Sequence, residues 1–164
     1  MTKKTVVFAA VGTDPQPFDR LLKTIDELIE QKTLVADVFC QTGYSKYKPK
    51  NAKWKDFLNP AEFNQKIREA DLVILHGGAG AIGTALQSRK TCIVMPRLFK
   101  FGEHANDHQL ELVRHLDTNG FILMANSPSE LEKMVKKAEN WKPRGFEGGK
   151  GIVKLLDLFV QNAF

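Results

Sequence analysis

The sequence predicts an α/β fold, a Rossmann-like open parallel sheet with helices on both faces. Apolar runs suited to strands alternate with segments whose apolar residues recur at helical spacing, which is typical of a parallel sheet covered on both sides. A glycine cluster follows one of these runs directly, and such sheets bind ligands at turns of this kind. The 164 residues fit a single domain, 1–164, that is large enough to bury its own core.

Five apolar runs are expected to be strands: Thr5–Ala10, Val35–Phe39, Leu72–Leu75, Thr91–Met95 and Phe121–Met124. After the first run, the apolar residues between Phe18 and Ile29 fall on one helical stripe, which we expect to pack on the sheet. Asn59-Pro60-Ala61-Glu62 and Ser127-Pro128-Ser129-Glu130 each combine a capping residue, a proline in the first turn and a glutamate three residues after the cap. Both therefore predict helix starts.

The glycine cluster His76-Gly77-Gly78-Ala79-Gly80 follows the expected strand Leu72–Leu75. Glycines let the backbone turn sharply and bring bare N–H groups close to a ligand. A helix expected over Ala81–Ser88 directs its positive N-terminal end at the same place, which favours an anion such as a nucleotide diphosphate. The alternative is a tight strand-to-helix turn that binds nothing.

Cys40 and Cys92 lie at the ends of apolar runs and far apart in the sequence, which fits reduced thiols and a cytoplasmic location. No segment reaches the roughly 20 apolar residues that a membrane span needs, so we expect no span in this chain.

The net charge of +5 comes largely from a lysine-rich run that is interleaved with aromatic residues, namely Lys46, Lys48, Lys50, Lys53 and Lys55 with Tyr44, Tyr47 and Trp54. Such a run can bind nucleic acid, but its turn residues favour a solvated loop, and no nucleic-acid partner is expected. A loop that faces a membrane or a protein partner is the better functional interpretation.

Three loops leave the carboxyl ends of expected strands and should converge on one crevice. They are Val11-Gly12-Thr13, the glycine cluster, and Met95-Pro96-Arg97 with the segment that follows it. No Gly-x-Ser-x-Gly elbow and no Asp-x-Asp pair is present. We therefore expect backbone groups, hydroxyls and Arg97 or a neighbour to hold a diphosphate without a metal ion.

The segment Glu103–Gln109 places two carboxylates, two imidazoles and two carboxamides within seven residues, ahead of an apolar helical pattern. Carboxylates and amides recognise the hydroxyls of sugars, which predicts a hexose site. One alternative is a polar helix start, with Asn106 as its cap and Asp107 complementing the helix dipole. Another is a metal site of His104 and His108, but a zinc-protease helix needs a glutamate directly after the first histidine, so no metal is expected.

Four motifs together resemble a known group of proteins: Val11–Leu21, Gln41–Ser45, the glycine cluster, and Pro96-Arg97 followed by Gly102–Gln109. The group is the soluble donor-binding subunits of two-component glycosyltransferases, a branch of the family 28 C-terminal domain. It includes the cytosolic half of the dolichol-pathway N-acetylglucosaminyltransferase and bacterial capsule and exopolysaccharide subunits. The resemblance spans nearly the whole chain.

The resemblance implies one half of a GT-B enzyme, which binds a UDP-sugar as its donor substrate and needs no cofactor. It implies an inverting, metal-independent hexosyl or N-acetylhexosaminyl transfer to a lipid-linked acceptor. A membrane-associated partner subunit would supply the acceptor site. This chain would then be cytoplasmic and would lie at the membrane through that partner.

The resemblance also implies roles for individual residues. Gly12, Thr13, Gly77, Gly78 and Gly80 would hold the diphosphate, and Glu103, Asn106, Asp107 and Gln109 would face the sugar. Glu103 and His104 are the candidate catalytic residues, and His76, Thr84, Arg97 and His108 complete the expected substrate site.

One position departs from the family pattern. Relatives commonly carry serine or threonine directly after the glycine cluster, where this chain has Ala81, and Thr84 one turn on is the candidate to compensate. The departure leaves a second interpretation open, a regulatory module that binds a nucleotide sugar without transferring it.

A connector rich in proline and glycine, 142–149, precedes a last helix expected over 150–162. Its apolar residues exceed one stripe, so this helix is expected either to be sandwiched or to dock on the partner.

Overall fold

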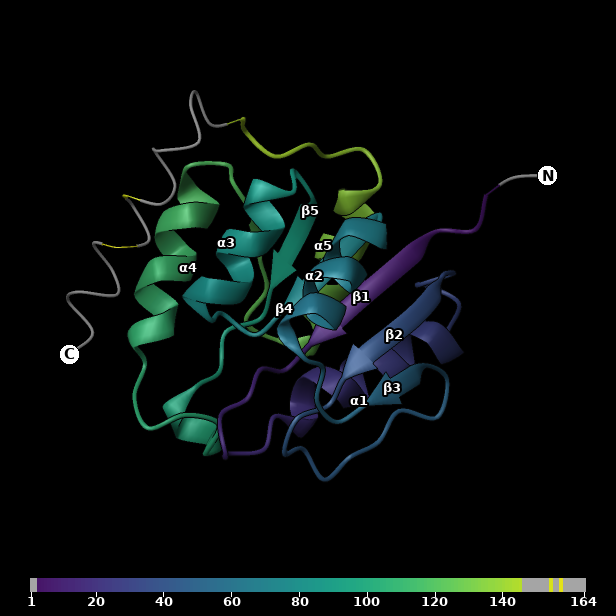
Figure 1. Ribbon diagram of the computed structural model, residues 1–164, viewed down its shortest axis with the longest axis horizontal. Helices are drawn as coiled ribbons and strands as arrows, with labels where there is room; N and C mark the ends of the chain where they lie inside the picture. The colour runs from purple at the N-terminus through teal and green to yellow at the C-terminus, as the bar shows by residue number, and fades with distance from the viewer. Residues whose placement is uncertain (1–2, 146–153, 155–156, 158–164) are drawn as a thin grey trace.

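The computed structural model describes residues 3–145, 154 and 157. Its centre is a six-stranded sheet in the order β3-β2-β1-β4-β5-β6, and every neighbouring pair is parallel. All the strands therefore end at one edge, the carboxyl edge, which is the lower edge in Figure 1. The strands are β1 Val6–Ala10, β2 Asp37–Gln41, β3 Lys53–Lys55, β4 Leu72–Leu75, β5 Thr91–Val94 and β6 Leu123–Met124.

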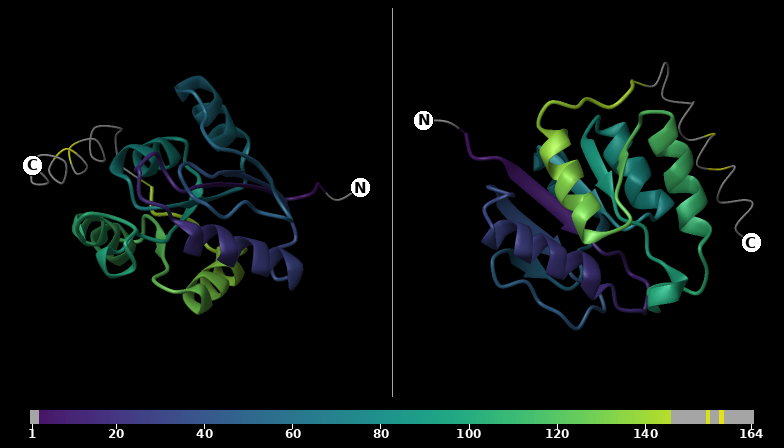
Figure 2. Two further views of the ribbon diagram at one scale, coloured as in Figure 1. Left: turned by 90° about the horizontal axis from the view of Figure 1, so that it is seen from below. Right: turned by 180° about the vertical axis from the view of Figure 1, so that it is seen from behind.

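Helices cover both faces of the sheet (Figure 2). Helices α1 (Asp19–Glu30) and α5 (Pro128–Ala138) pack on one face, against alternate residues such as Val7 and Ala9. The other face meets helices α2 (Pro60–Glu69), α3 (Ala79–Gln87) and α4 (His108–Thr118). A short 3₁₀ turn, η1, spans Phe99–Phe101. The predicted fold class is confirmed.

The two helix starts with proline in the first turn are also confirmed. Asn59 accepts a hydrogen bond from Glu62 N while the Glu62 side chain accepts one from Asn59 N, which completes a capping box. At the second start Ser127 caps Glu130 N in the same way. The Glu130 carboxylate, however, accepts from Asn126 N, one residue earlier than a capping box requires.

The lysine-rich run was predicted to be a solvated loop, and its last three residues differ from that prediction. Residues Lys53–Lys55 form an edge strand whose Trp54 is in register with Cys40 of β2. The last predicted strand is shorter than expected, because only Leu123–Met124 pairs with β5. Half of the connector, 146–149, and all of the helix predicted over 150–162 except residues 154 and 157 lie outside the described residues. No helix in the described part is long and apolar enough to span a bilayer.

Candidate functional site

The winding of the sheet reverses between β1 and β4, where parallel α/β sheets bind ligands. Here the loops after the two strands meet around His76. A Cβ atom added to Gly12 would lie 2.5 Å from His76 Nε2, and one added to Gly78 would lie closer still. Gly12 also has a φ of +85°, which side chains other than glycine rarely adopt. Only bare backbone fits on both sides of this ring, and we call Gly12, His76 and Gly78 the glycine–histidine cluster.

The imidazole of His76 is held in its neutral form. Burial of the ring, reinforced by the positive charge of Arg97, lowers the pKa of His76 to about 4. A neutral imidazole carries one donor and one acceptor nitrogen, so it can hydrogen-bond a ligand without adding charge. Near pH 7 the uncharged ring therefore packs between the backbones of Gly12 and Gly78.

The first turn of α3 begins beside this cluster. Gly78 is its N-cap residue, and no side chain caps the helix. Gly80 is exposed, and nothing within 4 Å would meet a Cβ added there. The hydroxyl of Thr84 donates to Gly80 O, one turn earlier in the same helix. The α3 N-terminus thus presents backbone donors rather than side chains.

Arg97, predicted as a diphosphate ligand, is fully buried inside the protein. Its Nε and Nη2 donate to Val11 O, and its Nη1 donates to Gln16 O and Glu103 O. The guanidinium therefore ties the loop after β1 to the loop after β5. These contacts brace the two loops and leave the guanidinium facing protein backbone.

Glu103 is likewise buried, with 3% of its surface exposed. Both of its oxygens accept hydrogen bonds from Arg20, at 2.9 and 3.0 Å, and Oε1 also accepts from Leu98 N. Arg20 in addition donates to the carbonyls of Pro96 and Asn126. The Arg20–Glu103 pair therefore clamps α1 to the loops after β5 and β6. Sequence reasoning assigned Arg20 no role of its own, although it stands in the family motif Val11–Leu21.

The remaining polar residues surround the start of α4. Asp107 accepts from Phe99 N, and Asn106 Oδ1 accepts from His108 N. The predicted cap at Asn106 is wrong, because Asp107 is the N-cap residue of α4 and makes no side-chain capping bond, while Asn106 lies one residue earlier. His104 Nε2 lies 3.6 Å from Asp14 Oδ2, which joins this segment to the loop after β1.

Gln109 packs against the glycine loop. A Cβ added to Gly77 would lie 3.0 Å from Gln109 Oε1. This oxygen is buried and accepts no hydrogen bond from any described residue. An unsatisfied buried acceptor is costly, so Gln109 is a place where a ligand donor would be favourable.

The structure therefore brings together Gly12, His76, Gly77, Gly78, Gln109 and the start of α3 at the carboxyl edge. Thr13 and His108 are exposed there, with no side-chain hydrogen bond to a described residue. A cavity of about 310 Å³ lies between the start of α1 and the loop after β5 and is lined by Pro17, Asp19, Arg20, Phe101, Gly102 and Glu103. No group of three or more metal-binding side chains occurs among the described residues.

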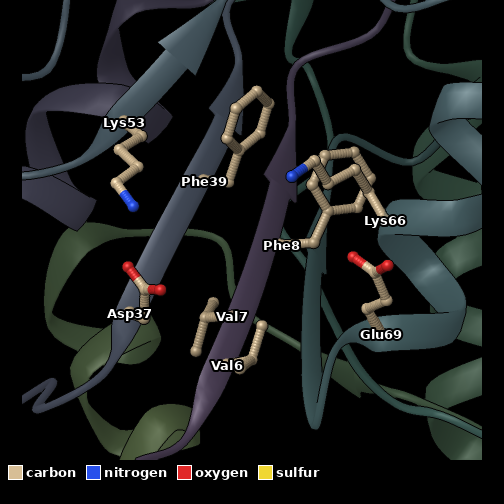
Figure 3. Close-up of a pocket in the computed structure, with 8 residues that line it drawn as sticks. All are labelled: Val6, Val7, Phe8, Asp37, Phe39, Lys53, Lys66 and Glu69. Carbon is tan, nitrogen blue, oxygen red and sulfur yellow. The ribbon is translucent and has the colours of Figure 1, made fainter.

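A second cavity, of about 220 Å³, lies on the α2 side of the sheet (Figure 3). It is floored by Phe8 and Phe39 and edged by Lys53, Lys66 and the carboxylates of Asp37 and Glu69. The ammonium group of Lys66 already lies 4.1 Å from the centre of the Phe39 ring. The cavity reaches the first residues of β1 and β2, so it is separate from the loops at the carboxyl edge.

Two curated relatives are UDP-N-acetylglucosamine–N-acetylmuramyl-(pentapeptide) pyrophosphoryl-undecaprenol N-acetylglucosamine transferases. The protein from Prochlorococcus marinus strain MIT 9312 is 25% identical over 146 residues, which cover 87% of this chain and 39% of that protein. The protein from Prochlorococcus marinus subsp. pastoris strain CCMP1986 is 29% identical over 147 residues, 85% of this chain and 38% of that protein. This chain thus spans well under half of their length.

Solved structures share the fold. The solution structure of ALG13 has a TM-score of 0.62 and 19% identity, with 94% of this chain and 95% of that chain covered. The crystal structure of Acinetobacter baumannii MurG has a TM-score of 0.59 and 17% identity, with 98% of this chain and 51% of that chain covered. The sequence also matches the glycosyltransferase family 28 C-terminal domain over residues 6–154. The expected resemblance is confirmed, and the chain belongs to the glycosyltransferase family 28 C-terminal domain family.

Proposed function

We propose that this chain is the donor-binding subunit of an inverting, metal-independent UDP-sugar glycosyltransferase. Its donor would bind at the carboxyl edge between β1, β4 and β5. A membrane-associated partner subunit would hold a lipid-linked acceptor, and the product would enter polysaccharide or glycolipid biosynthesis. The observation that carries this proposal is the glycine–histidine cluster beside the uncapped start of α3.

That cluster has the chemistry of a diphosphate site. Backbone N–H groups and the positive end of α3 attract an anion, and the glycines allow it to approach closely. As the sugar leaves, negative charge grows on the UDP diphosphate, and donors already in place stabilise that charge. Thr13, which is exposed in the loop after β1, supplies a hydroxyl to the same site.

The sugar would lie toward the start of α4. The free Oε1 of Gln109 is available to accept a hydrogen bond from a sugar hydroxyl. Asn106, Asp107 and His108 directly precede Gln109 in the sequence and are exposed. The names of the curated relatives favour UDP-N-acetylglucosamine as the first donor to test.

Two residues predicted as catalytic take different roles in this proposal. Glu103 is a positioning residue, because both of its oxygens are engaged by Arg20 and Leu98 N. His104 is the candidate catalytic residue, since it is part-exposed and its Nε2 faces the carboxylate of Asp14. An imidazole N–H can donate a hydrogen bond to an anionic donor substrate.

The alternative function is a regulatory module that binds the nucleotide sugar without transferring it. One observation favours it. Ala81 provides no hydroxyl in the first turn of α3, and the Thr84 hydroxyl already donates to Gly80 O. Sugar transfer by the complex of this chain with its partner, and loss of transfer in a His104→Ala complex, would exclude the regulatory module.

Calorimetry with UDP and UDP-N-acetylglucosamine in the presence of EDTA tests the proposed function. We expect binding of both without a divalent ion. Gly78→Val should weaken UDP by at least about tenfold, because the new side chain presses on His76. Gly145→Val is the matched control, since Gly145 is exposed and has open space around it.

Gln109→Ala should spare UDP and weaken the sugar nucleotide. Absence of UDP binding, or binding that requires a metal ion, would overturn the proposed function. Equal loss of UDP in folded Gly78→Val and Gln109→Ala proteins would overturn the placement of the sugar. Thermal unfolding of each variant shows whether the fold is retained.

A further inference from the structure

Four large aromatic or phenolic side chains are exposed along the carboxyl edge. Tyr44 is 55% exposed, Phe57 40%, Phe99 62% and Phe101 53%. They are four of the six large apolar side chains that are exposed in the described part of the chain. The segments that carry them, after β2, after β3 and in η1, all lie at the lower edge of Figure 1. We call these four residues the aromatic rim.

The two halves of the rim are connected. The Tyr44 and Phe57 rings meet edge to face, with centroids 5.0 Å apart. Two residues beyond Tyr44, the backbone N–H of Lys46 donates to Asp19 Oδ1 at 2.9 Å. Asp19 in turn lines the 310 Å³ cavity together with Phe101. The rim is therefore one band along the edge, with an open cavity in its middle.

Lysines accompany the rings. Lys46, in the lysine-rich run beside Tyr44, and Lys100, in η1, are exposed and make no ion pair with any described residue. The ammonium group of Lys100 lies 4.9 Å from the centre of the Phe101 ring. Two other lysines of the same run, Lys48 and Lys55, are paired with Asp56 and Glu62. The band thus combines exposed rings with unpaired positive charge.

We propose that the aromatic rim and its unpaired lysines contact the anionic surface of a lipid bilayer directly. Protein interfaces are enriched in aromatic residues but depleted in lysine, so lysines beside the rings favour a bilayer over a protein partner. At a membrane surface, rings sit among the headgroups while lysine stems lie alongside and their ammonium groups meet anionic lipids.

This contact extends the proposed function and rests on it, because transfer to a lipid-linked acceptor is the reason for the chain to approach a lipid surface. The rim shares the carboxyl edge with the glycine–histidine cluster. A bilayer held at the rim would bring the donor site close to the headgroup of a lipid-linked acceptor. The chain would then contribute to membrane association itself, in addition to its partner subunit.

Vesicle flotation with the purified full-length chain, without a partner, tests the contact. We compare phosphatidylcholine vesicles with vesicles that contain roughly 30% phosphatidylglycerol. We expect the wild type to bind the anionic vesicles at least about tenfold more tightly, with binding that weakens as salt rises. Phe99→Ser with Phe101→Ser, and separately Lys46→Glu with Lys100→Glu, should each reduce that binding by about tenfold or more.

The matched control combines Val35→Ser with Lys133→Glu. Val35 is 71% exposed but precedes β2 at the opposite edge, and Lys133 is exposed on α5. This control should bind the vesicles like the wild type. The contact is overturned if the wild type does not bind anionic vesicles, if the rim variants bind as it does, or if the control loses binding equally.

Calorimetry with UDP on the same proteins separates the two proposals. Rim variants that bind UDP normally but no longer bind the anionic vesicles support the membrane contact. Their unchanged UDP affinity shows that they are folded. A wild type that floats with anionic vesicles but binds no UDP would support the membrane contact and overturn the proposed function. A wild type that binds UDP normally but does not float with anionic vesicles would overturn the membrane contact alone.

Discussion

Arg97 is buried with its guanidinium bonded to three backbone carbonyls from two loops. We expect Arg97→Leu to lower the free energy of unfolding by at least about 3 kcal/mol, because three buried acceptors lose their donors together. Urea unfolding measures this loss. Arg114→Leu is the control, since Arg114 is exposed on α4 and its replacement should change stability by less than about 0.5 kcal/mol. A similar small loss for both variants would contradict the bracing role of Arg97.

The His76 imidazole links stability to pH. Its pKa is about 4 in the folded protein, below the ordinary 6.5, because burial and Arg97 disfavour the charged ring. As pH falls, the unfolded chain therefore binds a proton first, and stability that is fully present above pH 6.5 is lost between pH 6.5 and 4. The loss from this group amounts to roughly 3 kcal/mol.

We expect His76→Gln to remove that part of the pH dependence. Urea unfolding at several pH values compares the two proteins, and the difference between their slopes isolates the histidine from the carboxylates. An NMR titration of the His76 ring in the wild type provides an independent measurement. A midpoint near the ordinary value of 6.5, or equal pH slopes in the two proteins, would show that the ring is not held neutral.

The candidate site could be predicted from the sequence only in part. The glycines and the polar segment Glu103–Gln109 were recognisable, because loops after parallel strands meet at one edge. The inward direction of Glu103 was not, since its partner Arg20 lies 83 residues away and no local pattern reports such a pair. Arg97 likewise faces backbone carbonyls up to 86 residues distant. Local sequence gives the chemistry of a side chain but not which groups it will face.

At the scale of elements, the Asp26 carboxylate holds the second half of the segment between β2 and β3. Asp26 on α1 is buried and accepts hydrogen bonds from the Tyr47 hydroxyl, Lys50 N and Asn51 N at 2.6 to 2.8 Å. The Asp26 carboxylate raises the pKa of the Tyr47 hydroxyl to about 12. These bonds hold the approach to the edge strand β3 against α1.

We expect Asp26→Ala to lower the free energy of unfolding by about 3 kcal/mol, because several bonds to one charged acceptor are lost. Tyr47→Phe removes only one of them and should cost about 1 kcal/mol. Hydrogen exchange adds a local measurement, in which the Lys50 and Asn51 amides should exchange faster in Asp26→Ala alone. Unchanged exchange at these amides would show that another contact holds the segment.

The elements differ in how well the sequence predicted them. Strands β1, β4 and β5 are buried on both faces and read as continuous apolar runs. β3 was missed because Lys53, Trp54 and Lys55 are all exposed, and its existence depends on pairing with β2. An edge strand of this kind carries no apolar pattern of its own, and only tertiary pairing creates it.

At the scale of the whole molecule, the described residues form one Rossmann-like unit around one sheet. We expect the purified chain to transfer little or no sugar, and transfer to appear when a membrane-associated partner supplies the acceptor. An assay with radiolabelled UDP-N-acetylglucosamine and membrane extracts, with and without the partner, measures this. Full activity from the purified chain alone would contradict the division into two subunits.

Both outer strands of the sheet are very short. β3 has three residues, with lysine at each end, and β6 has two. A long, uncharged outer strand offers its unpaired backbone groups to the strands of other molecules, which is how sheets grow into aggregates. Two or three residues, charged in β3, make a poor template for such growth. Copies of this chain can therefore crowd together on a surface or around a partner without their sheets joining edge to edge.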